Sequence, residues 1–202
     1  IAQLIGGAPA NGKSTLLESG AFDTPPNDVK INPDDIKADL PEYNPLISQR
    51  EKKAASFVHE ESSDISKVLQ RAAIKMKSNV TADQVFDNGF ETAAKKLKAF
   101  KEAGYYVKMD YVSLDSKLSE KLADLRYKST GRYVVNAFLK HANNDIPNTF
   151  QKLAKSGLPD ELRLWDTNVN KKPRLIAEAI GGNIKIHDEK LWQDFLAKEK
   201  KR

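Results

Sequence analysis

The sequence predicts an α/β fold in which helices cover both faces of a mostly parallel sheet, giving three layers. Two observations support this class. Apolar segments typical of strands alternate with segments of helical periodicity along most of the chain. A short apolar strand at the N-terminus also runs through a glycine-containing loop into a helix, the first half of a β-α-β unit. The 202 residues are enough for one domain with a substantial core.

Each element is expected from a local pattern. Strands are expected at apolar runs between turn residues, over 1–6, 29–31, 84–87, 105–112 and 162–166. Helices are expected at three- and four-residue apolar spacing, over 13–19, 47–77, 91–103, 115–127, 134–156 and 191–198. A short helix also begins at Pro33 and is ended by Pro41 and Pro45. Breaks are expected near Ser62 and at Pro147.

The C-terminal part is expected to be an addition to the main domain. Residues 1–170 form that domain, and 171–202 form an extension packed on it. Within the extension, residues 173–188 are expected to form a hairpin turning at 181–183, or a strand after a short helix. Because the sequence opens on Ile1, inside an expected core strand, we expect the natural chain to begin earlier.

Composition narrows the classes of protein. The net charge is +5, and residues 198–202 supply +3 of it (four basic, one acidic), so the rest is close to balanced and nucleic acid is not the expected partner. No apolar run is long enough to cross a membrane, and we expect no membrane partner. The absence of cysteine excludes disulfides and thiolate zinc sites. We expect a cytoplasmic protein.

The loop after the first strand carries the strongest motif. Residues 7–14 read Gly-Ala-Pro-Ala-Asn-Gly-Lys-Ser and match G-x-x-x-x-G-K-[ST], a loop whose N–H groups cradle phosphates at a helix N-terminus. We expect Lys13 to reach the β- and γ-phosphates of a nucleoside triphosphate, and Ser14 to bind Mg²⁺. The nucleotide-binding residues are then Gly7, Ala8, Pro9, Ala10, Asn11, Gly12, Lys13, Ser14 and Thr15.

Acids follow the second and third expected strands. Asp34 lies in the first turn of the helix after Asn32, where an acid complements the helix dipole but also reaches an acceptor hydroxyl in a phosphate-loop kinase. We favour the second role for Asp34. Asp87 ends the third expected strand, and either binds Mg²⁺ or caps the next helix; Asn88 follows it on the acceptor side.

Two further pairs are candidates. Glu60 or Glu61 faces inward from the long helix between apolar neighbours, unless both belong to a solvated face. Arg126 and Arg132 flank a polar turn, and would cover the γ-phosphate as a lid unless they are surface arginines.

Together these segments resemble the zeta toxin family of P-loop kinases. The resemblance rests on the phosphate loop, Ile31-Asn32-Pro33-Asp34-Asp35, Leu40-Pro41-Glu42-Tyr43, Val58-His59-Glu60-Glu61-Ser62, Arg126 and Gly131-Arg132, and it extends to residue 168. It implies ATP or GTP with Mg²⁺ as donor, the 3′-hydroxyl of the sugar in UDP-N-acetylglucosamine as acceptor, and a small helical antitoxin that blocks the nucleotide site. It implies Asp34 as the base, Glu61 or Glu60 as a substrate ligand, and Arg126 and Arg132 around the transferred phosphate.

The sequence departs from the family in two places. The turn between Arg126 and Arg132 is shorter, and Asp87-Asn88-Gly89 stands where the family has an acid, a small residue and threonine, so a substrate-contacting hydroxyl is missing. Relatives phosphorylate other acceptors, including a nicotinamide dinucleotide. A nucleotide, dinucleotide or polynucleotide kinase, or a nucleotide-binding module without turnover, therefore stays open as an alternative.

Overall fold

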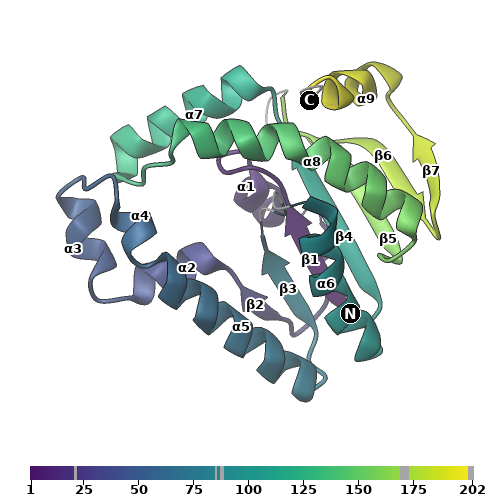
Figure 1. The fold of residues 1–202 in the computed structure, drawn as a ribbon, viewed down its shortest axis with the longest axis horizontal. Helices are drawn as coiled ribbons and strands as arrows, with labels where there is room; N and C mark the ends of the chain where they lie inside the picture. Colours follow the sequence, from purple (N-terminus) through teal and green to yellow (C-terminus); the bar gives the residue numbers. More distant parts are fainter. Residues whose placement is uncertain (21, 85, 87–88, 169–172, 200–202) are drawn as a thin grey trace.

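One sheet runs through the molecule (Figure 1). The computed structural model describes residues 1–202 apart from 21, 85, 87–88, 169–172 and 200–202. The strands lie in the order β2-β3-β1-β4-β5-β6-β7, and those from β2 to β5 are parallel whereas β6 and β7 are antiparallel. They are β1 (Ala2–Gly6), β2 (Val29–Ile31), β3 (Val80–Asp83), β4 (Val107–Ser113), β5 (Glu161–Asp166), β6 (Arg174–Ile180) and β7 (Asn183–Ile186). The predicted α/β class with a mostly parallel sheet is confirmed.

Helices cover both faces of this sheet. They are α1 (Lys13–Glu18), α2 (Pro33–Asp39), α3 (Tyr43–Ser48), α4 (Ala54–Phe57), α5 (His59–Lys75), α6 (Gly89–Glu102), α7 (Ser116–Thr130), α8 (Asn136–Ser156) and α9 (Glu189–Leu196). On one face, Leu4 and Met109 belong to the large core that α6, α8 and α9 complete. On the other face, Ile5 and Val112 pack against Leu16 of α1. Because side chains alternate along a strand, successive residues pack against the helices on opposite faces of the sheet.

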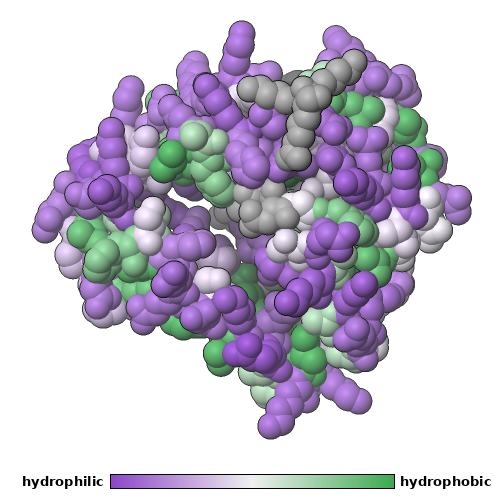
Figure 2. All heavy atoms as spheres, viewed as in Figure 1, coloured by the Kyte–Doolittle hydropathy of each residue, from purple (hydrophilic) through white to green (hydrophobic). Residues whose placement is uncertain are grey.

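Two groups of helices project beyond the carboxyl ends of the strands (Figure 1). The first arm consists of α2 to α5, and the second arm consists of α7 and the start of α8. The surface is hollowed between them (Figure 2). In an open parallel sheet, this edge is where ligands bind. No helix in the described part of the chain has the length and apolar character needed to cross a bilayer.

The third strand lies earlier in the chain than predicted. It is β3, Val80–Asp83, and the expected strand over 84–87 is wrong: Gln84 and Phe86 belong to no strand, and the rest lies outside the described residues. The first three residues of β3 are buried beside β1, so the segment shows no alternation of apolar and polar residues. The acid that closes this strand is therefore Asp83.

The long helix expected over 47–77 is divided into α3, α4 and α5. The break expected near Ser62 is absent: Ser62 is buried inside α5, and its hydroxyl donates a hydrogen bond to the His59 carbonyl at 2.9 Å. Pro45 lies inside α3 instead of ending a helix, in the first turn, where a backbone N–H has no helical partner. Pro147 likewise lies inside α8, whose buried face packs on the sheet. Residues 174–186 form the hairpin.

A buried carboxylate joins three strands of the sheet. Asp110 on β4 is fully buried and accepts hydrogen bonds from the side chains of Gln3 (2.9 Å), Arg163 (2.8 and 3.0 Å) and Trp165 (2.7 Å). Asp110→Ala is expected to lower the free energy of unfolding by about 3 kcal/mol, because it leaves those donors unpaired. Urea denaturation measures this loss. Asp64→Ala, which removes only an exposed ion pair, is the control and should change the free energy of unfolding much less. An equal loss of stability in the two variants would contradict the structural role given to Asp110.

Candidate active site

Glycine determines the path of the phosphate loop between β1 and α1. Gly7 has a φ of +139°, and a Cβ atom there would lie 2.8 Å from the carbonyl oxygen of Val112. Gly12 has a φ of +85° at the N-cap of α1. A side chain at either position would be strained, so the two glycines permit the curled backbone that an anion nest requires.

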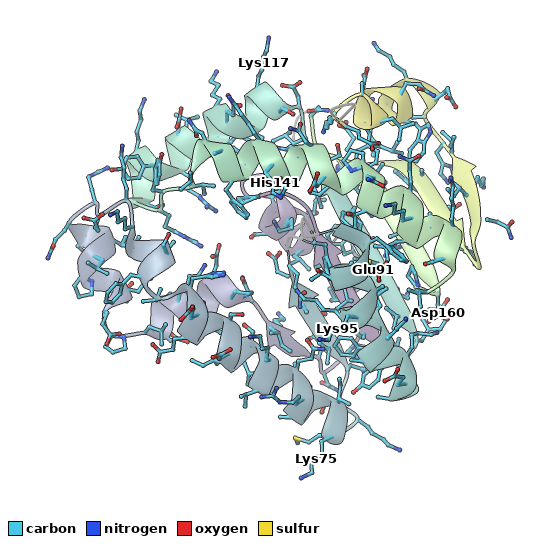
Figure 3. All side chains as sticks on the ribbon, in the orientation of Figure 1. Lys75, Glu91, Lys95, Lys117, His141 and Asp160 are labelled. Atoms are coloured by element: carbon cyan, nitrogen blue, oxygen red, sulfur yellow. The ribbon has the colours of Figure 1, made fainter. Side chains whose placement is uncertain are left out.

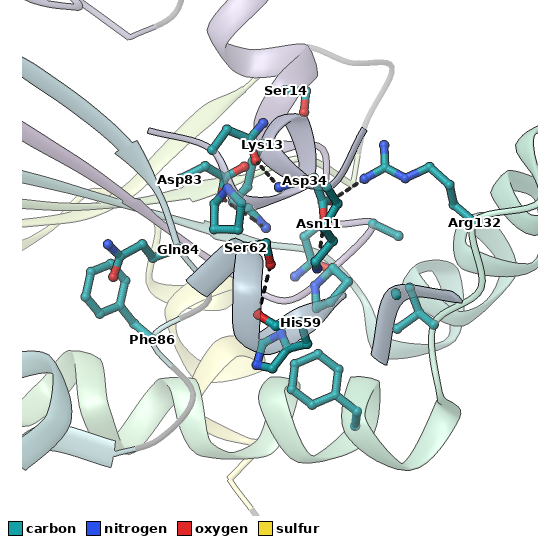
Figure 4. Close-up of a pocket in the computed structure, with 18 of the residues that line it drawn as sticks. Asn11, Lys13, Ser14, Asp34, His59, Ser62, Asp83, Gln84, Phe86 and Arg132 are labelled. Atoms are coloured by element: carbon teal, nitrogen blue, oxygen red, sulfur yellow. Dashed lines mark hydrogen bonds and ion pairs between the residues drawn. The ribbon is translucent and has the colours of Figure 1, made fainter. Parts of the chain in front are cut away.

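Lys13 lies folded over this loop. Its Nζ donates hydrogen bonds to the carbonyl oxygens of Gly7 (2.9 Å) and Ala8 (3.2 Å), and lies 3.7 Å from the carboxylate of Asp83 (Figure 4). Burial raises the pKa of Asp83; the charge of Lys13 opposes this, and that of Asp34 adds to it. An ammonium and a carboxylate therefore meet at the mouth of the phosphate loop.

Asn11 anchors the loop to the rest of the molecule. It is 2% exposed, its Oδ1 accepts a hydrogen bond from Ser119 on α7 at 2.8 Å, and its carbonyl accepts one from Thr167 after β5 at 3.0 Å. Sequence reasoning missed Ser119 and Thr167, which are 108 and 156 residues away in the chain. No local pattern marks a contact of that separation. The phosphate loop and α7 thus form one hydrogen-bonded unit.

Asp34 stands at the start of α2, as predicted. The Asn32 side chain caps this helix by accepting from the Asp34 N–H at 3.0 Å. The carboxylate forms an ion pair with Arg132 from across the cavity and lies 3.4 Å from the Nζ of Lys37 (Figure 4). Burial favours a raised pKa, but Arg132, Lys37 and Arg126 outweigh it and hold the pKa of Asp34 below its ordinary value. The group is ionised at neutral pH and able to accept a proton.

Arg126 lies on α7 with its Nε buried and without a hydrogen-bond partner among the described residues. Burial lowers its pKa, and the nearby charge of Arg132 lowers it further. Two guanidinium groups that repel each other are stabilised by an anion that binds near both of them. Arg126, Arg132 and Asp34 are the predicted residues that the structure brings together from the two arms.

A cavity of about 1060 Å³ connects these groups, lined by residues 9–16 of the phosphate loop, by Asp34 and Asp83, and by both arms. Side chains from both arms project into the space between them (Figure 3). Among the described residues, the cations that line it are Lys13, Lys37, Lys52, Lys67, Lys96, Arg126 and Arg132, and the acids are Asp34 and Asp83. The excess of positive charge suits two anionic ligands.

Two predicted site residues are not brought to this cavity. Glu60 and Glu61 are exposed on α5 and do not line it, so the expectation that one of them faces inward is not met. Helical spacing gives that face of α5 to other residues, namely His59, Ser62, Ser63 and Ser66. Asp87 and Asn88 lie outside the described residues. Asp83, which sequence reasoning missed, occupies the strand end that had been assigned to Asp87.

The chain is similar to several solved structures. One is a chain of the PezAT chromosomal toxin-antitoxin system of Streptococcus pneumoniae. The match covers 100% of this chain and 79% of that one, with 17% identity and a TM-score of 0.74. Another is a chain of the AvrRxo1-ORF1:-ORF2 complex with ATP. That match covers 99% of this chain and 64% of the other chain, with 14% identity and a TM-score of 0.71. This chain thus spans less than two thirds of that one. At these identities the likeness shows the fold.

Other solved structures resemble the fold less closely. A chain of the Pnkp1/Rnl/Hen1 RNA repair complex matches with a TM-score of 0.56 and 18% identity, over 86% of this chain and 47% of that one. No curated protein matches the chain. The family model for zeta toxin, however, matches residues 1–177, which is most of the sequence. The chain therefore belongs to the zeta toxin family.

Proposed function

We propose that the protein is a kinase that transfers the γ-phosphate of ATP or GTP to a sugar hydroxyl of a small acceptor. The observation that carries this proposal is the ion pair of Asp34 with Arg132 across the cavity that opens from the phosphate loop. A base, two arginines and a phosphate cradle are the groups that phosphoryl transfer requires.

Each group has a part in the reaction. The loop N–H groups and Lys13 hold the β- and γ-phosphates, and Lys13 exchanges its two carbonyl partners for phosphate oxygens. Asp34 accepts the proton of the acceptor hydroxyl while the new O–P bond forms and the bond to the β-phosphate oxygen breaks. Arg126 and Arg132 stabilise the charge on the transferred group. When Arg132 turns to the phosphate, Asp34 becomes free for the acceptor.

The oxygen ligands present fit magnesium. Ser14 and Asp83 both line the cavity, and the described residues hold no group of three or more acids, histidines or cysteines that could bind a metal alone. Mg²⁺ characteristically takes one or two protein oxygens together with substrate phosphates. We propose that these two residues hold Mg²⁺, which supplies charge neutralisation between the β- and γ-phosphates when bound.

Asp83→Asn is expected to stabilise the ligand-free protein while reducing Mg²⁺-dependent turnover. The folded pKa of Asp83 is raised by burial, so the ionised form opposes folding at every pH above the ordinary value of 3.8. Thermal unfolding at pH 7 should show a higher midpoint for the variant, and the difference should shrink as the pH falls toward 3.8. A variant that is less stable at pH 7 yet equal in turnover would contradict both parts.

The acceptor is proposed to be anionic and to contain a base or another flat ring. Lys37, Lys52 and Lys96 line the cavity, and Lys96 lies 5.3 Å from the ring centre of Phe86. UDP-N-acetylglucosamine has this chemistry, and so do dinucleotides. A hollow of this size between two arms suits such small acceptors better than it suits a polynucleotide.

Turnover with a panel of acceptors tests the proposal. ATP or GTP consumption is measured with UDP-N-acetylglucosamine, a nicotinamide dinucleotide and an oligonucleotide, and the product is identified by mass spectrometry. Acceptor-dependent phosphorylation of a nucleotide sugar or dinucleotide supports a small-molecule kinase. Phosphorylation of the oligonucleotide alone would assign a polynucleotide kinase, and nucleotide binding without turnover would assign a regulatory module.

A protein partner is also proposed. The PezAT neighbour is a toxin-antitoxin system, and AvrRxo1-ORF1 was solved with ORF2. An antitoxin that covers the nucleotide cavity would restrain a cytoplasmic kinase of this kind. Co-expression with the product of a neighbouring small gene, followed by co-purification and an activity assay, tests this proposal.

A further inference from the structure

The two arms also touch at the rim of the cavity, at a contact that we name the clasp. It joins Arg50 and Lys52, in the segment between α3 and α4, to Tyr127, Lys128 and Tyr133 at the end of the second arm. Figure 1 shows the end of α7 beside α3 and α4. Lys52 and Tyr133 also line the cavity, whereas Arg50, Tyr127 and Lys128 do not and have no part in the chemistry proposed above, so their contacts need their own explanation.

The backbone of Arg50 is unusual. Its φ is +56°, in the left-handed region. Its N–H donates to Ile47 at 2.9 Å and the next N–H, of Glu51, donates to Leu46 at 2.9 Å, which is the hydrogen-bonding pattern that ends a helix at a glycine. Arginine is strained at this position and glycine is not. A reason for arginine must therefore lie in its side chain.

The side chain of Arg50 caps another helix. NH1 donates to the carbonyl oxygens of Tyr127 (3.4 Å) and Lys128 (3.3 Å), and NH2 donates to that of Lys128 at 3.2 Å. These carbonyls belong to the last turn of α7, which carries the negative end of the helix dipole. The Tyr127 carbonyl also accepts a hydrogen bond from the Gly131 N–H at 2.8 Å. In return, the Tyr127 hydroxyl donates to the Arg50 carbonyl at 3.2 Å. The contact is reciprocal.

The backbones also approach closely beside this cap. Gly131 ends α7 with a φ of +76°, and a Cβ atom there would lie 2.6 Å from the carbonyl oxygen of Ile47. Lys52 places its Nζ 5.1 Å from the ring centre of Tyr133. The clasp therefore combines a helix cap, a cation–π contact and a close backbone contact at the junction of the arms.

The end of α7 that Arg50 caps lies between the two arginines of the proposed active site. Arg126 comes one residue before Tyr127, and Arg132 comes one residue after Gly131. Both project into the cavity, and Arg132 meets Asp34 of the first arm. We propose that Arg50 is a positioning residue: by capping α7 from across the cavity, it keeps Arg126 and Arg132 facing Asp34. This inference rests on the proposed kinase function.

Arg50→Gly tests the role of the side chain without disturbing the backbone conformation. Glycine suits the left-handed conformation, so the variant should fold, while the cap of α7 is lost. We expect kcat to fall roughly 10-fold, with the KM for the nucleotide changed much less, because the phosphate loop is untouched. Arg50→Lys keeps a cation near the carbonyls and should recover part of the loss.

Lys77→Gly is the matched control. Lys77 has a φ of +53° at the end of α5, with the same pair of backbone hydrogen bonds, to Ile74 (3.1 Å) and from Ser78 to Ala73 (3.0 Å). Within the described residues its side chain has no hydrogen bond or ion pair. This control should keep the kcat of the wild type. Equal kcat for wild type, Arg50→Gly and Lys77→Gly would overturn the inference.

A distance measurement tests the clasp independently of the kinase. The chain contains no cysteine, so Lys53→Cys and Lys128→Cys introduce two unique spin-label sites, one on each side of the clasp. The distance distribution should broaden in Arg50→Gly and stay unchanged in Lys77→Gly; an unchanged distribution in both would overturn the inference. If the wild type phosphorylated no acceptor, the kinase proposal would fail, and this measurement would still decide whether Arg50 holds the arms together.

Discussion

Lys13→Ala is expected to lower kcat/KM for the nucleotide by roughly 10³-fold, through loss of both binding and transition-state stabilisation. The Nζ atom already lies at the mouth of the phosphate loop, bound to the carbonyls of Gly7 and Ala8 and 3.7 Å from Asp83. Without it, the γ-phosphate would lose the ammonium that balances its charge beside the Asp83 carboxylate. Nucleotide binding by calorimetry and steady-state turnover measure the two losses separately.

Lys75→Ala provides the control for the Lys13 variant. Lys75 lies in the last turn of α5 and points away from the cavity (Figure 3). Its removal lowers the net charge by the same amount and should leave turnover within about 2-fold, because exposed charges act weakly at a distance. If both variants bound the nucleotide as the wild type does, the phosphate loop would not be the donor site.

The phosphate loop and the helix that carries Asp34 could be predicted because their signals are local. A glycine at a left-handed position, or an Asn-Pro-Asp sequence at a helix start, specifies the backbone within a few residues. β3 lacked such a signal. It is four residues long, mostly buried and preceded by a helix, so its sequence shows no alternation. The third strand was therefore predicted a few residues further along the chain, over 84–87, and Asp83 was overlooked.

The contacts that assemble the site are of another kind. The bond from Ser119 to Asn11 and the cap that Arg50 places on α7 join segments 108 and about 77 residues apart. Periodicity shows which face of a helix is buried but not which partner it meets. Arg50 was even less predictable, because arginine stands at a helix end that favours glycine. Such positions become visible only with the fold.

Asp34→Asn is expected to reduce kcat by roughly 10³-fold while nucleotide affinity stays close to that of the wild type. The amide keeps the size of the side chain and the N–H that Asn32 caps, so the start of α2 should be unchanged. The side chain is 43% exposed, toward the cavity, which leaves it open to an acceptor hydroxyl. An amide cannot take the proton, and this alone should account for the loss.

Asp35→Asn is the matched control, one residue along the same helical turn, exposed and absent from the cavity lining. It should retain the turnover of the wild type.

The pH dependence of turnover separates a base from a merely structural acid. Arg132, Lys37 and Arg126 hold the folded pKa of Asp34 below 3.8, so its carboxylate supports folding above that pH and loses this effect as the pH falls through the folded value. Turnover should therefore persist to pH 5 without loss of an ionised base. A fall in kcat centred near pH 7 that Asp34→Asn abolished would place the pKa above its ordinary range, and would contradict the ion pair with Arg132 as the ground state of the site.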